Sequence, residues 1–496
     1  MNRTMPFAWT AARSAQTAAR VVLVQDGQAL VPPSLPAPDR RALAAWLKAA
    51  RFAGTAGATA WPTGLTTPVL LAGIGKKKEF HPARWLRAWA GIGRELAKSA
   101  ALPQVAFEWP ATADFSLDTA TLAGLAADGL LAGAYVFEAY KTKKSNRPGV
   151  FAWTGRILGA RAVRMAIHRA EIAGSILNEI RDLANLPANE LSPLDLAVRA
   201  RKLARREGVS CRIWDMAALA REKCGALLAI AQGSKRPGCL IRLAYPGQRR
   251  SRRKPLVLVG KAVMFDTGGI SLKPPKNMEW MKYDKSGGMV ALATVLLAAR
   301  LKLPRPVVAY IPAVENMPGG GASRPGDIVV ARNGKTVELL NTDAEGRMIL
   351  ADALSFAAEE NPAAIVDIAT LTGAVIIALG HEATAVMGSD DGLVLDLMLS
   401  GEATGERLWP LPLWPEYDEM LDGQFADLKN VGDGSAGTIA GGAFLKHFVP
   451  AGIPWAHLDI AGTAWLEENK PQGVPGATLA CVRLLTDWCA RAHLPT

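Results

Sequence analysis

The sequence predicts an α/β protein with a small N-terminal α/β domain and a larger C-terminal α/β domain whose central sheet is flanked by helices. Three observations carry this prediction. The chain has 496 residues, more than one hydrophobic core ordinarily serves. Patterns typical of strands and of helices alternate along it. After about residue 190 the strand patterns become apolar on both faces, which indicates a sheet covered on both sides.

The N-terminal part alternates short apolar runs with helical patterns. Strands are predicted at Val21–Val24 and Val69–Leu71, and helices at Asp39–Arg51 and His81–Leu102. This part contains no cluster of residues with recognisable chemistry. The polar, basic stretch Phe137–Pro148 then predicts a linker or the edge of a hairpin.

A long helical pattern, Ala160–Leu186, connects the two parts. It ends at the proline-containing segment Leu186–Pro193, which also opens the next helix. We therefore predict an N-terminal domain over residues 1–155, a connecting helix over residues 156–190 and a C-terminal domain over residues 191–496.

The C-terminal part holds the most apolar strands. They are predicted at Leu256–Val259, Val307–Val314 and Ala364–Thr370, and helices are predicted at Gly288–Arg300 and Met348–Glu360. Ligand sites in sheets of this kind gather at the carboxyl ends of the strands, so we look for chemistry there.

Composition narrows the class of protein. The formal net charge is +12, which leaves nucleic acid open as a partner, but only Arg249–Lys254 gathers the basic residues, in an expected exposed turn. Five cysteines without a C-x-x-C pair predict neither a disulfide framework nor a thiolate zinc site. No run reaches the roughly 18 apolar residues of a membrane span, and the first 20 residues lack a secretory apolar region. We expect a cytoplasmic protein with no membrane partner and a short N-terminal lead.

The most informative segment is Asn341–Arg347. It places Asp343, Glu345 and Arg347 within five residues, just after the apolar-rich Val337–Leu340. In an extended backbone, side chains two residues apart face the same way, so the two carboxylates would point together. Neighbouring carboxylates repel each other, and a divalent cation would compensate that repulsion.

A second polar cluster follows the strand Leu256–Val259. It contains Lys261, Asp266, Lys273 and Asp284, and the glycine pair that follows Asp266 permits tight turns. Taken singly, such an Asp or Lys is ordinarily a helix cap, a turn residue or a solvated charge. Taken together, the carboxylates and lysines at strand ends indicate an oxygen-ligated divalent metal.

These residues together make the sequence resemble the leucyl aminopeptidase family, the M17 cytosolic metallopeptidases. The resemblance covers most of residues 160–490 and is looser over 1–150. It implies a mixed sheet in the larger domain and assembly as a homohexamer. The matching segments are NTDAEGR at 341–347, VGKAVMFDTGGISLKP at 259–274, MKYD at 281–284, NMPGGGASRPGDIV at 316–329, DIATLTGA at 367–374 and HLDIAGTAW at 457–465.

The resemblance implies two divalent metal ions, Mn²⁺ or Zn²⁺, with Mg²⁺ as a further candidate. One ion would be held by Lys261, Asp266, Asp284 and Glu345, and the other by Asp266, Asp343 and Glu345. Asp266 and Glu345 would then be shared, which screens two neighbouring dications from each other. A lysine can be such a ligand only as a neutral amine.

The implied reaction is hydrolysis of the first peptide bond of a peptide. Lys273 would stabilise the oxyanion of the tetrahedral intermediate, and Arg347 would hold a bicarbonate that serves as general base. Met281, Thr370 and Gly373 would line the pocket for the substrate side chain, where an apolar Met favours Leu-like residues.

Two alternatives stay open beside the aminopeptidase. A regulatory DNA-binding protein, with or without peptidase activity, draws support from the positive charge and Arg249–Lys254. A two-metal nuclease or phosphatase explains the carboxylates, but it gives no particular role to Lys261 or to the pair Lys273 and Arg347.

Overall fold

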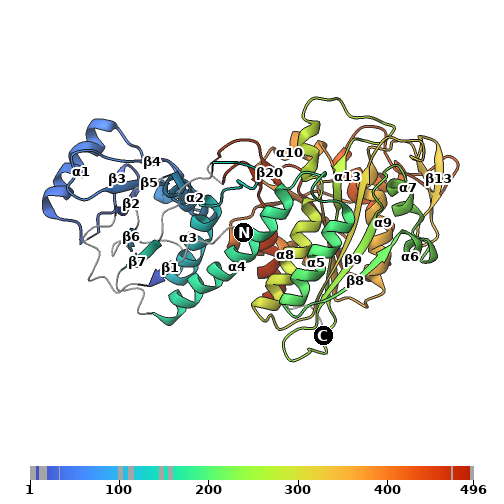
Figure 1. The fold of residues 1–496 in the computed structure, drawn as a ribbon, viewed down its shortest axis with the longest axis horizontal. Helices are drawn as coiled ribbons and strands as arrows, with labels where there is room; N and C mark the ends of the chain where they lie inside the picture. The colour runs from blue at the N-terminus through green and yellow to red at the C-terminus, as the bar shows by residue number, and fades with distance from the viewer. Residues whose placement is uncertain are drawn as a thin grey trace. The chain divides into compact units, whose positions relative to one another are not determined.

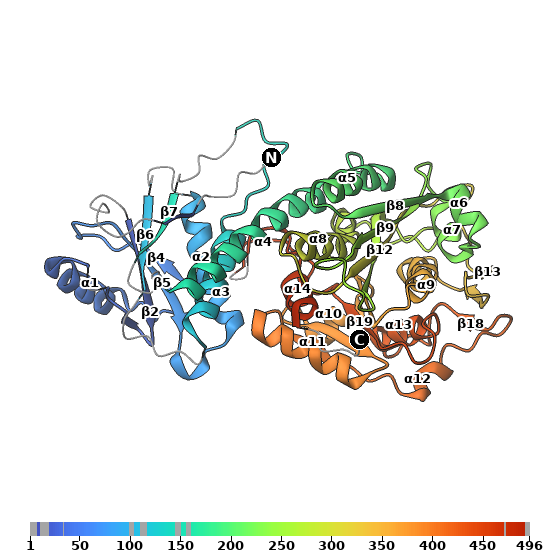
Figure 2. The same ribbon diagram turned by 90° about the horizontal axis from the view of Figure 1, so that it is seen from below.

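A computed structural model describes residues 7–9, 19–32, 34–98, 104–109, 117–143, 150–154, 160–470 and 473–491. The chain divides into two compact units. The first comprises Met1–Glu179 with Leu466–Gly476, and the second comprises Ile180–Trp465 with Ala477–Thr496. Figures 1 and 2 show each unit as a sheet with helices packed on it. The predicted two-part α/β architecture is confirmed.

The first unit is built on a sheet whose strand order is β1-β7-β6-β2-β5-β4, with β3 paired to β2. Side chains of β2 alternate between the two faces, as a strand requires. Val21 and Leu23 pack with α2 and α3, whereas Val22 and Val24 pack with α1. The elements are β1 (Phe7–Trp9), β2 (Ala19–Gln25), β3 (Gln28–Ala29), α1 (Ala37–Ala50), β4 (Thr59–Ala60), β5 (Val69–Gly75), α2 (Pro82–Lys98), β6 (Gln104–Glu108), α3 (Thr119–Gly133) and β7 (Val150–Thr154).

Glycines let α2 and α3 approach each other closely. A Cβ atom at Gly133 would lie 1.9 Å from the carbonyl oxygen of Ala90, and one at Gly93 would lie 2.2 Å from that of Leu130. Gly93 of α2 and Gly133 of α3 therefore serve the packing of these two helices. The predicted helix at His81–Leu102 is observed to Lys98, and its last residues lie outside the described part of the chain.

Helix α4 (Arg161–Asn185) is observed where the long helical pattern was predicted, and the division between the two units falls within it, after Glu179. Helix α5 (Pro193–Arg206) follows it. Ser192 and Asp195 cap α5 reciprocally, each side chain accepting a hydrogen bond from the backbone N–H of the other residue. The domain limits at residues 155 and 190 stay predictions.

The second unit is built on a nine-stranded mixed sheet of order β17-β16-β19-β15-β10-β12-β9-β8, with β11 paired to β12. Strands β10, β12, β15 and β19 run parallel. Strand β9 pairs antiparallel with β8 and β12, and β16 pairs antiparallel with β19 and parallel with β17. The mixed sheet is confirmed. Its strands are β8 (Ser210–Asp215), β9 (Cys239–Tyr245), β10 (Leu256–Gly260), β11 (Ala262–Asp266), β12 (Val307–Asn316), β15 (Ala364–Ala369), β16 (Thr384–Gly388), β17 (Leu408–Pro410) and β19 (Trp455–Asp459).

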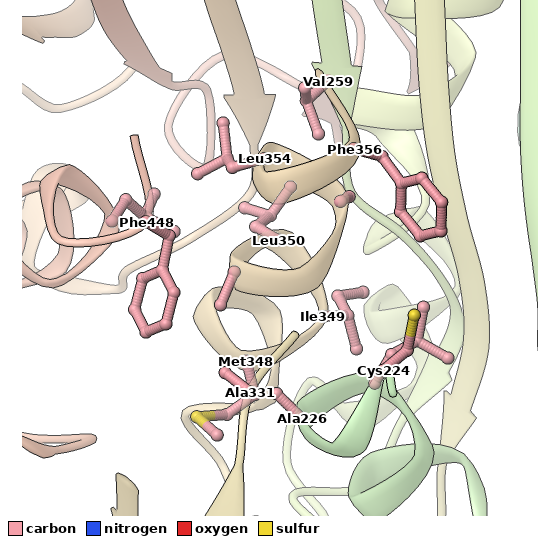
Figure 3. Packing of buried hydrophobic residues seen from close by; sticks show 14 of the residues in the cluster. Cys224, Ala226, Val259, Ala331, Met348, Ile349, Leu350, Leu354, Phe356 and Phe448 are labelled. Carbon is pink, nitrogen blue, oxygen red and sulfur yellow. The ribbon is translucent and has the colours of Figure 1, made fainter. Parts of the chain in front are cut away.

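Helices cover both faces of this sheet (Figure 1). Helices α5 and α8 (Ser286–Arg300) lie on one side, and α7 (Gly225–Ala231) and α9 (Glu345–Ala358) lie on the other. Figure 3 shows the core on the α9 side, where Ile349, Leu350 and Leu354 pack among Val259, Phe356 and other fully buried side chains. This dense core fixes α9, and with it the residues at the first turn of α9.

Candidate metal centre

The two polar clusters of the sequence meet at one edge of the larger sheet. Lys261 lies between the end of β10 and the start of β11, and Asp266 is the last residue of β11. Asp284 lies just before α8, after the short 3₁₀ helix η3 (Met278–Tyr283). Asp343 lies in the turn that follows β14 (Thr336–Leu339), and Glu345 is the first residue of α9.

The extended backbone expected for Asn341–Arg347 is wrong. Glu345 is the first residue of α9, and the residues before it form a turn. The side chain of Asn341 accepts a hydrogen bond from the backbone N–H of Asp343 at 2.8 Å, which stabilises that turn in place of a strand. The turn still brings the two carboxylates together, because it leads Asp343 back toward the amino end of α9.

Glycines allow the loops to close around the site. Gly268 and Gly269 adopt φ values of 86° and 68°, and this left-handed turn lets the N–H of Lys273 reach the carbonyl of Thr267 at 2.8 Å. A Cβ atom at Gly346 would lie 2.8 Å from Nζ of Lys261. Gly346 therefore leaves the space through which the lysine reaches the carboxylates.

Three carboxylates converge in this site. One oxygen from each of Asp266, Asp343 and Glu345 lies within 4.8 Å of the others. Asp266 and Glu345 are almost fully buried, with 2% and 1% of their surface exposed. Burying like charges this close is costly unless positive charge compensates them.

Lys261 provides the first compensation. Its Nζ lies 2.8 Å from Oδ1 of Asp284 and 2.7 Å from Oε1 of Glu345, and it donates to the carbonyl of Thr370 at 2.8 Å. Burial opposes the charged amine, but the carboxylates of Asp284, Glu345 and Asp266 raise the pKa of Lys261 above its ordinary value. The ammonium group therefore lies between two carboxylates, a position that favours a cation.

Lys273 provides the second compensation. Its Nζ lies 2.9 Å from Oδ2 of Asp266 and forms an ion pair with Asp343. Burial opposes its charge, while the carboxylates of Asp266, Glu345 and Asp343 raise the pKa of Lys273. Burial and the neighbouring Asp266 in turn raise the pKa of Asp343 to about 6.

The residues fit divalent cations. Oδ2 of Asp284 is buried and has no hydrogen-bond partner among the described residues, and burial raises the pKa of this carboxyl group. Four carboxylates therefore share two ammonium groups, and one buried oxygen lacks a partner. Carboxylate oxygens are the ligands that Mn²⁺ and Mg²⁺ prefer, and Zn²⁺ also accepts a neutral amine.

Arg347 lies on the first turn of α9, next to this cluster. Its Nη1 donates to the carbonyl of Asn430 at 2.8 Å, and its guanidinium lies 5.9 Å from the ring centroid of Phe444. Burial lowers the pKa of Arg347 to about 10, so the group stays charged at neutral pH. A guanidinium can hold a planar anion through two parallel N–H donors.

The three predicted pocket residues do not share one environment. The hydroxyl of Thr370 donates to Oδ1 of Asp284 at 2.6 Å, so it supports a carboxylate of the metal cluster. Met281 is half-buried on η3. Gly373 is exposed just before α10 (Ala374–Leu379), and a Cβ atom there would meet nothing within 4 Å among the described residues.

Two buried asparagines at the site were not among the predicted site residues, although Asn316 is the first residue of the matching segment 316–329. Asn316 donates to Oδ1 of Asp266 at 2.8 Å. Asn430 holds the backbone of Leu340 and Asn341 with its side chain and Arg347 with its carbonyl. Neither residue stands near its partners in the sequence, so spacing could not reveal the contact.

Lys285, which follows Asp284, is also buried. Its Nζ donates to the carbonyl of Leu186 at 3.0 Å and to that of Lys282. Its hydrogen bonds therefore go to backbone carbonyls rather than to the carboxylate cluster.

An α/β fold that gathers four carboxylates and two lysines at the edge of its larger sheet defines a metal-dependent hydrolase. The family models identify which one. The model of the cytosol aminopeptidase family catalytic domain matches residues 178–486, and that of the N-terminal domain of the same family matches residues 21–144. The chain belongs to the cytosol aminopeptidase family, whose members are metallo-exopeptidases, and the predicted resemblance is confirmed.

Individual relatives agree with this assignment. A protein of Syntrophotalea carbinolica named "Probable cytosol aminopeptidase" is 48% identical over 365 residues, which is 73% of each chain. One of the same name from Geotalea uraniireducens is 42% identical over 426 residues, 85% of this chain and 84% of the relative. The solved structure of the bottromycin maturation enzyme BotP in complex with Mn has a TM-score of 0.83 and 30% identity, covering 96% of this chain and 99% of that one.

The hydropathy of the helices adds one finding. In the described part of the chain, no helix is both long enough and apolar enough to span a membrane.

Proposed function

We propose that this metal-dependent aminopeptidase removes the N-terminal residue from peptides, with a preference for Leu-like residues, by means of two divalent ions. Lys261, Asp266, Asp284 and Glu345 hold one ion, and Asp266, Asp343 and Glu345 hold the other. The observation that supports this most is the position of the two lysine ammonium groups, each between two carboxylates of the cluster. Mn²⁺ and Zn²⁺ are the proposed ions, with Mg²⁺ as a further candidate.

When bound, the ions supply an acidified water and polarise the scissile carbonyl. Lys273 then stabilises the oxyanion that forms on that carbonyl. Its exposed fraction of 21% supports this role, since the side chain lies at the open side of the cluster while Lys261 is enclosed.

Arg347 serves as the anchor for a bicarbonate that takes the proton of the attacking water. The contacts of Asn430 and Phe444 fix the guanidinium, which supports the pre-organised binding of a planar anion. Met281 and Gly373 contact the substrate side chain, and Thr370 both faces that pocket and steadies Asp284.

The cellular setting is also part of the proposal. Relatives carry the name cytosol aminopeptidase, which supports a cytoplasmic peptidase acting on peptides. A homohexamer is the proposed assembly. The comparisons give the DNA-binding alternative no support, although Arg249–Lys254 is an exposed loop as expected.

Hydrolysis of leucine p-nitroanilide tests the proposal. Removal of metal with a chelator should abolish activity, and added Mn²⁺ or Zn²⁺ should restore it. Glu345→Ala removes a proposed ligand of both ions. It should lower kcat/KM by about a thousandfold or more, because both the binding of the ions and the positioning of the substrate on them are weakened.

Glu359→Ala is the matched control, because it truncates a glutamate at the opposite end of the same helix. Its activity should stay near that of the wild type. Activity that survives metal removal, or that Glu345→Ala leaves unchanged, contradicts the proposed site.

A further inference from the structure

Asn316 connects the two loops that carry the metal-binding carboxylates. It is the last residue of β12, it lies beside Asp266 in the pairing of β11 with β12, and it is 3% exposed. Its Nδ2 donates to Oδ1 of Asp266 at 2.8 Å and to the carbonyl of Thr342 at 3.0 Å. One amide group therefore holds Asp266 and the residue that precedes Asp343.

The loop that follows Asp266 also packs against both the backbone and the side chain of Asn316. The carbonyl of Asn316 accepts hydrogen bonds from the N–H and the hydroxyl of Thr267, at 3.0 and 2.9 Å. A Cβ atom at Gly269 would lie 2.9 Å from both Oδ1 of Asn316 and Oγ1 of Thr342. Because Gly269 has no side chain, its loop packs directly against the side chain of Asn316.

The hydrogen bonds of Asn316 also determine which oxygen of Asp266 faces a cation. Oδ1 of Asp266 accepts from Nδ2 of Asn316 and from the N–H of Gly268 at 2.9 Å. These two donors use both lone pairs of that oxygen. Oδ2, which lies 2.9 Å from Nζ of Lys273, is the oxygen left for a metal ion.

We propose that Asn316 is a positioning residue that joins Asp266 and the Asp343 loop into one preformed half of the metal centre. This inference rests on the proposed function. The other half has its own support, because the hydroxyl of Thr370 holds Asp284, whereas the side chain of Asn316 donates to Asp266 and Thr342. Asp266 serves both proposed ions, whereas the Asp343 loop serves only one, so loss of Asn316 should weaken the ion held by Asp343 more than the ion held by Lys261 and Asp284.

Titration of the full-length, chelator-stripped protein with MnCl₂ in a calorimeter tests this. The wild type should bind two Mn²⁺ per chain. In Asn316→Ala, one of the two dissociation constants should rise by about 10- to 100-fold, the usual effect of losing a group that orients a ligand, and the other should change less. A purely structural role would shift both equally or neither.

Ser234→Ala is the matched control. The hydroxyl of Ser234 donates to Glu315, so its loss disturbs the same end of β12 without touching either loop. Both dissociation constants should stay within about twofold of the wild type, since distant changes ordinarily add independently. If the Asn316→Ala protein does not fold, Asn316→Ser is measured instead. The smaller serine side chain leaves room for a water molecule, which can form hydrogen bonds with the buried groups that Asn316 contacted.

Three outcomes are informative. A selective loss of one site in the Asn316 variant supports the inference. Two unchanged constants, or an equal loss at both sites, overturn it while the proposed function stands. A wild type that binds no Mn²⁺ overturns the proposed function itself.

Discussion

At the scale of single residues, the site is a set of buried charges that neutralise one another in pairs. Lys261 and Lys273 each lie between two carboxylates, where their ammonium groups offset the negative charge. A buried carboxylate cluster is unstable without cations of some kind. The lysines supply that positive charge, which explains why basic and acidic residues occur together at the site.

A second buried pair lies away from the carboxylates, in the sheet itself. Nδ1 of His457 lies 2.5 Å from Oδ1 of Asp367, and Nε1 of Trp455 donates to the other oxygen of Asp367 at 2.7 Å. Burial opposes the charge of His457, but Asp367 raises the pKa of this imidazole above its ordinary value. The folded state therefore binds the proton more tightly than the unfolded chain does.

This pair makes stability depend on pH. Because the pKa of His457 is higher in the folded state, its contribution is full below about pH 6.5, the value in unfolded chains, and is lost as the pH rises through the folded pKa. Asp367→Asn keeps the shape and removes the charge. Urea denaturation with chelator present should show a deficit in unfolding free energy that is largest near pH 6 and shrinks toward pH 9. A deficit that does not change with pH would rule out the charged pair.

At the scale of helices and strands, α9 carries both the chemistry and the core. Asp352, fully buried in its middle, accepts from the N–H of Leu227 at 2.8 Å and from the N–H of Arg332 at 2.7 Å. It thereby joins α9 to α7 and to the segment after β13 (Asp327–Val330). These bonds help to set the register of the helix whose first turn holds Glu345 and Arg347.

Removing this link should lower stability markedly. Asp352→Ala leaves two buried N–H groups without their acceptor, and each such group costs roughly 1–3 kcal/mol, so the unfolding free energy should fall by about 2–6 kcal/mol. Asp391→Ala, at the exposed first turn of α11 (Asp391–Thr404), should cost less than about 1 kcal/mol. Equal effects of the two changes in denaturation would contradict this account of Asp352.

The sequence predicted the core strands better than it predicted the loops. Apolar runs gave β10, β12 and β15 to within two residues, because a buried parallel strand has no polar face to obscure it. The start of α9 was wrong, because the side chain of Asn341 creates a local turn that a two-residue period does not reveal. The antiparallel strands that make the sheet mixed came only from the resemblance to a family.

The sequence likewise predicted some residues of the candidate site and missed others. Lys261, Asp266, Lys273, Asp284, Asp343 and Glu345 were all named from the sequence, and the structure brings them together. Asn316 and Asn430 were missed, because a single asparagine carries no pattern of spacing and their contacts join residues 26 to 90 positions apart in the sequence. Residues that orient metal-binding side chains can be recognised only when the positions of the loops in the structure are known.

At the scale of the whole molecule, the chemistry belongs to the larger unit alone. Each of the proposed metal and catalytic residues lies within Ile180–Trp465. The described residues of the smaller unit contain no comparable group of metal-binding side chains. Its core is instead aromatic, with Trp85, Trp89 and Phe107 in edge and tilted contacts.

The number of metal ions bound to each chain tests the central claim most directly. The protein is stripped with a chelator, loaded with Mn²⁺, freed of excess ion and analysed for manganese by elemental analysis. We expect two ions per wild-type chain and fewer than two in Glu345→Ala, because the carboxylate of Glu345 is a proposed ligand of both ions. A wild type that retains no manganese, or a Glu345→Ala variant that retains as much as the wild type, would contradict it.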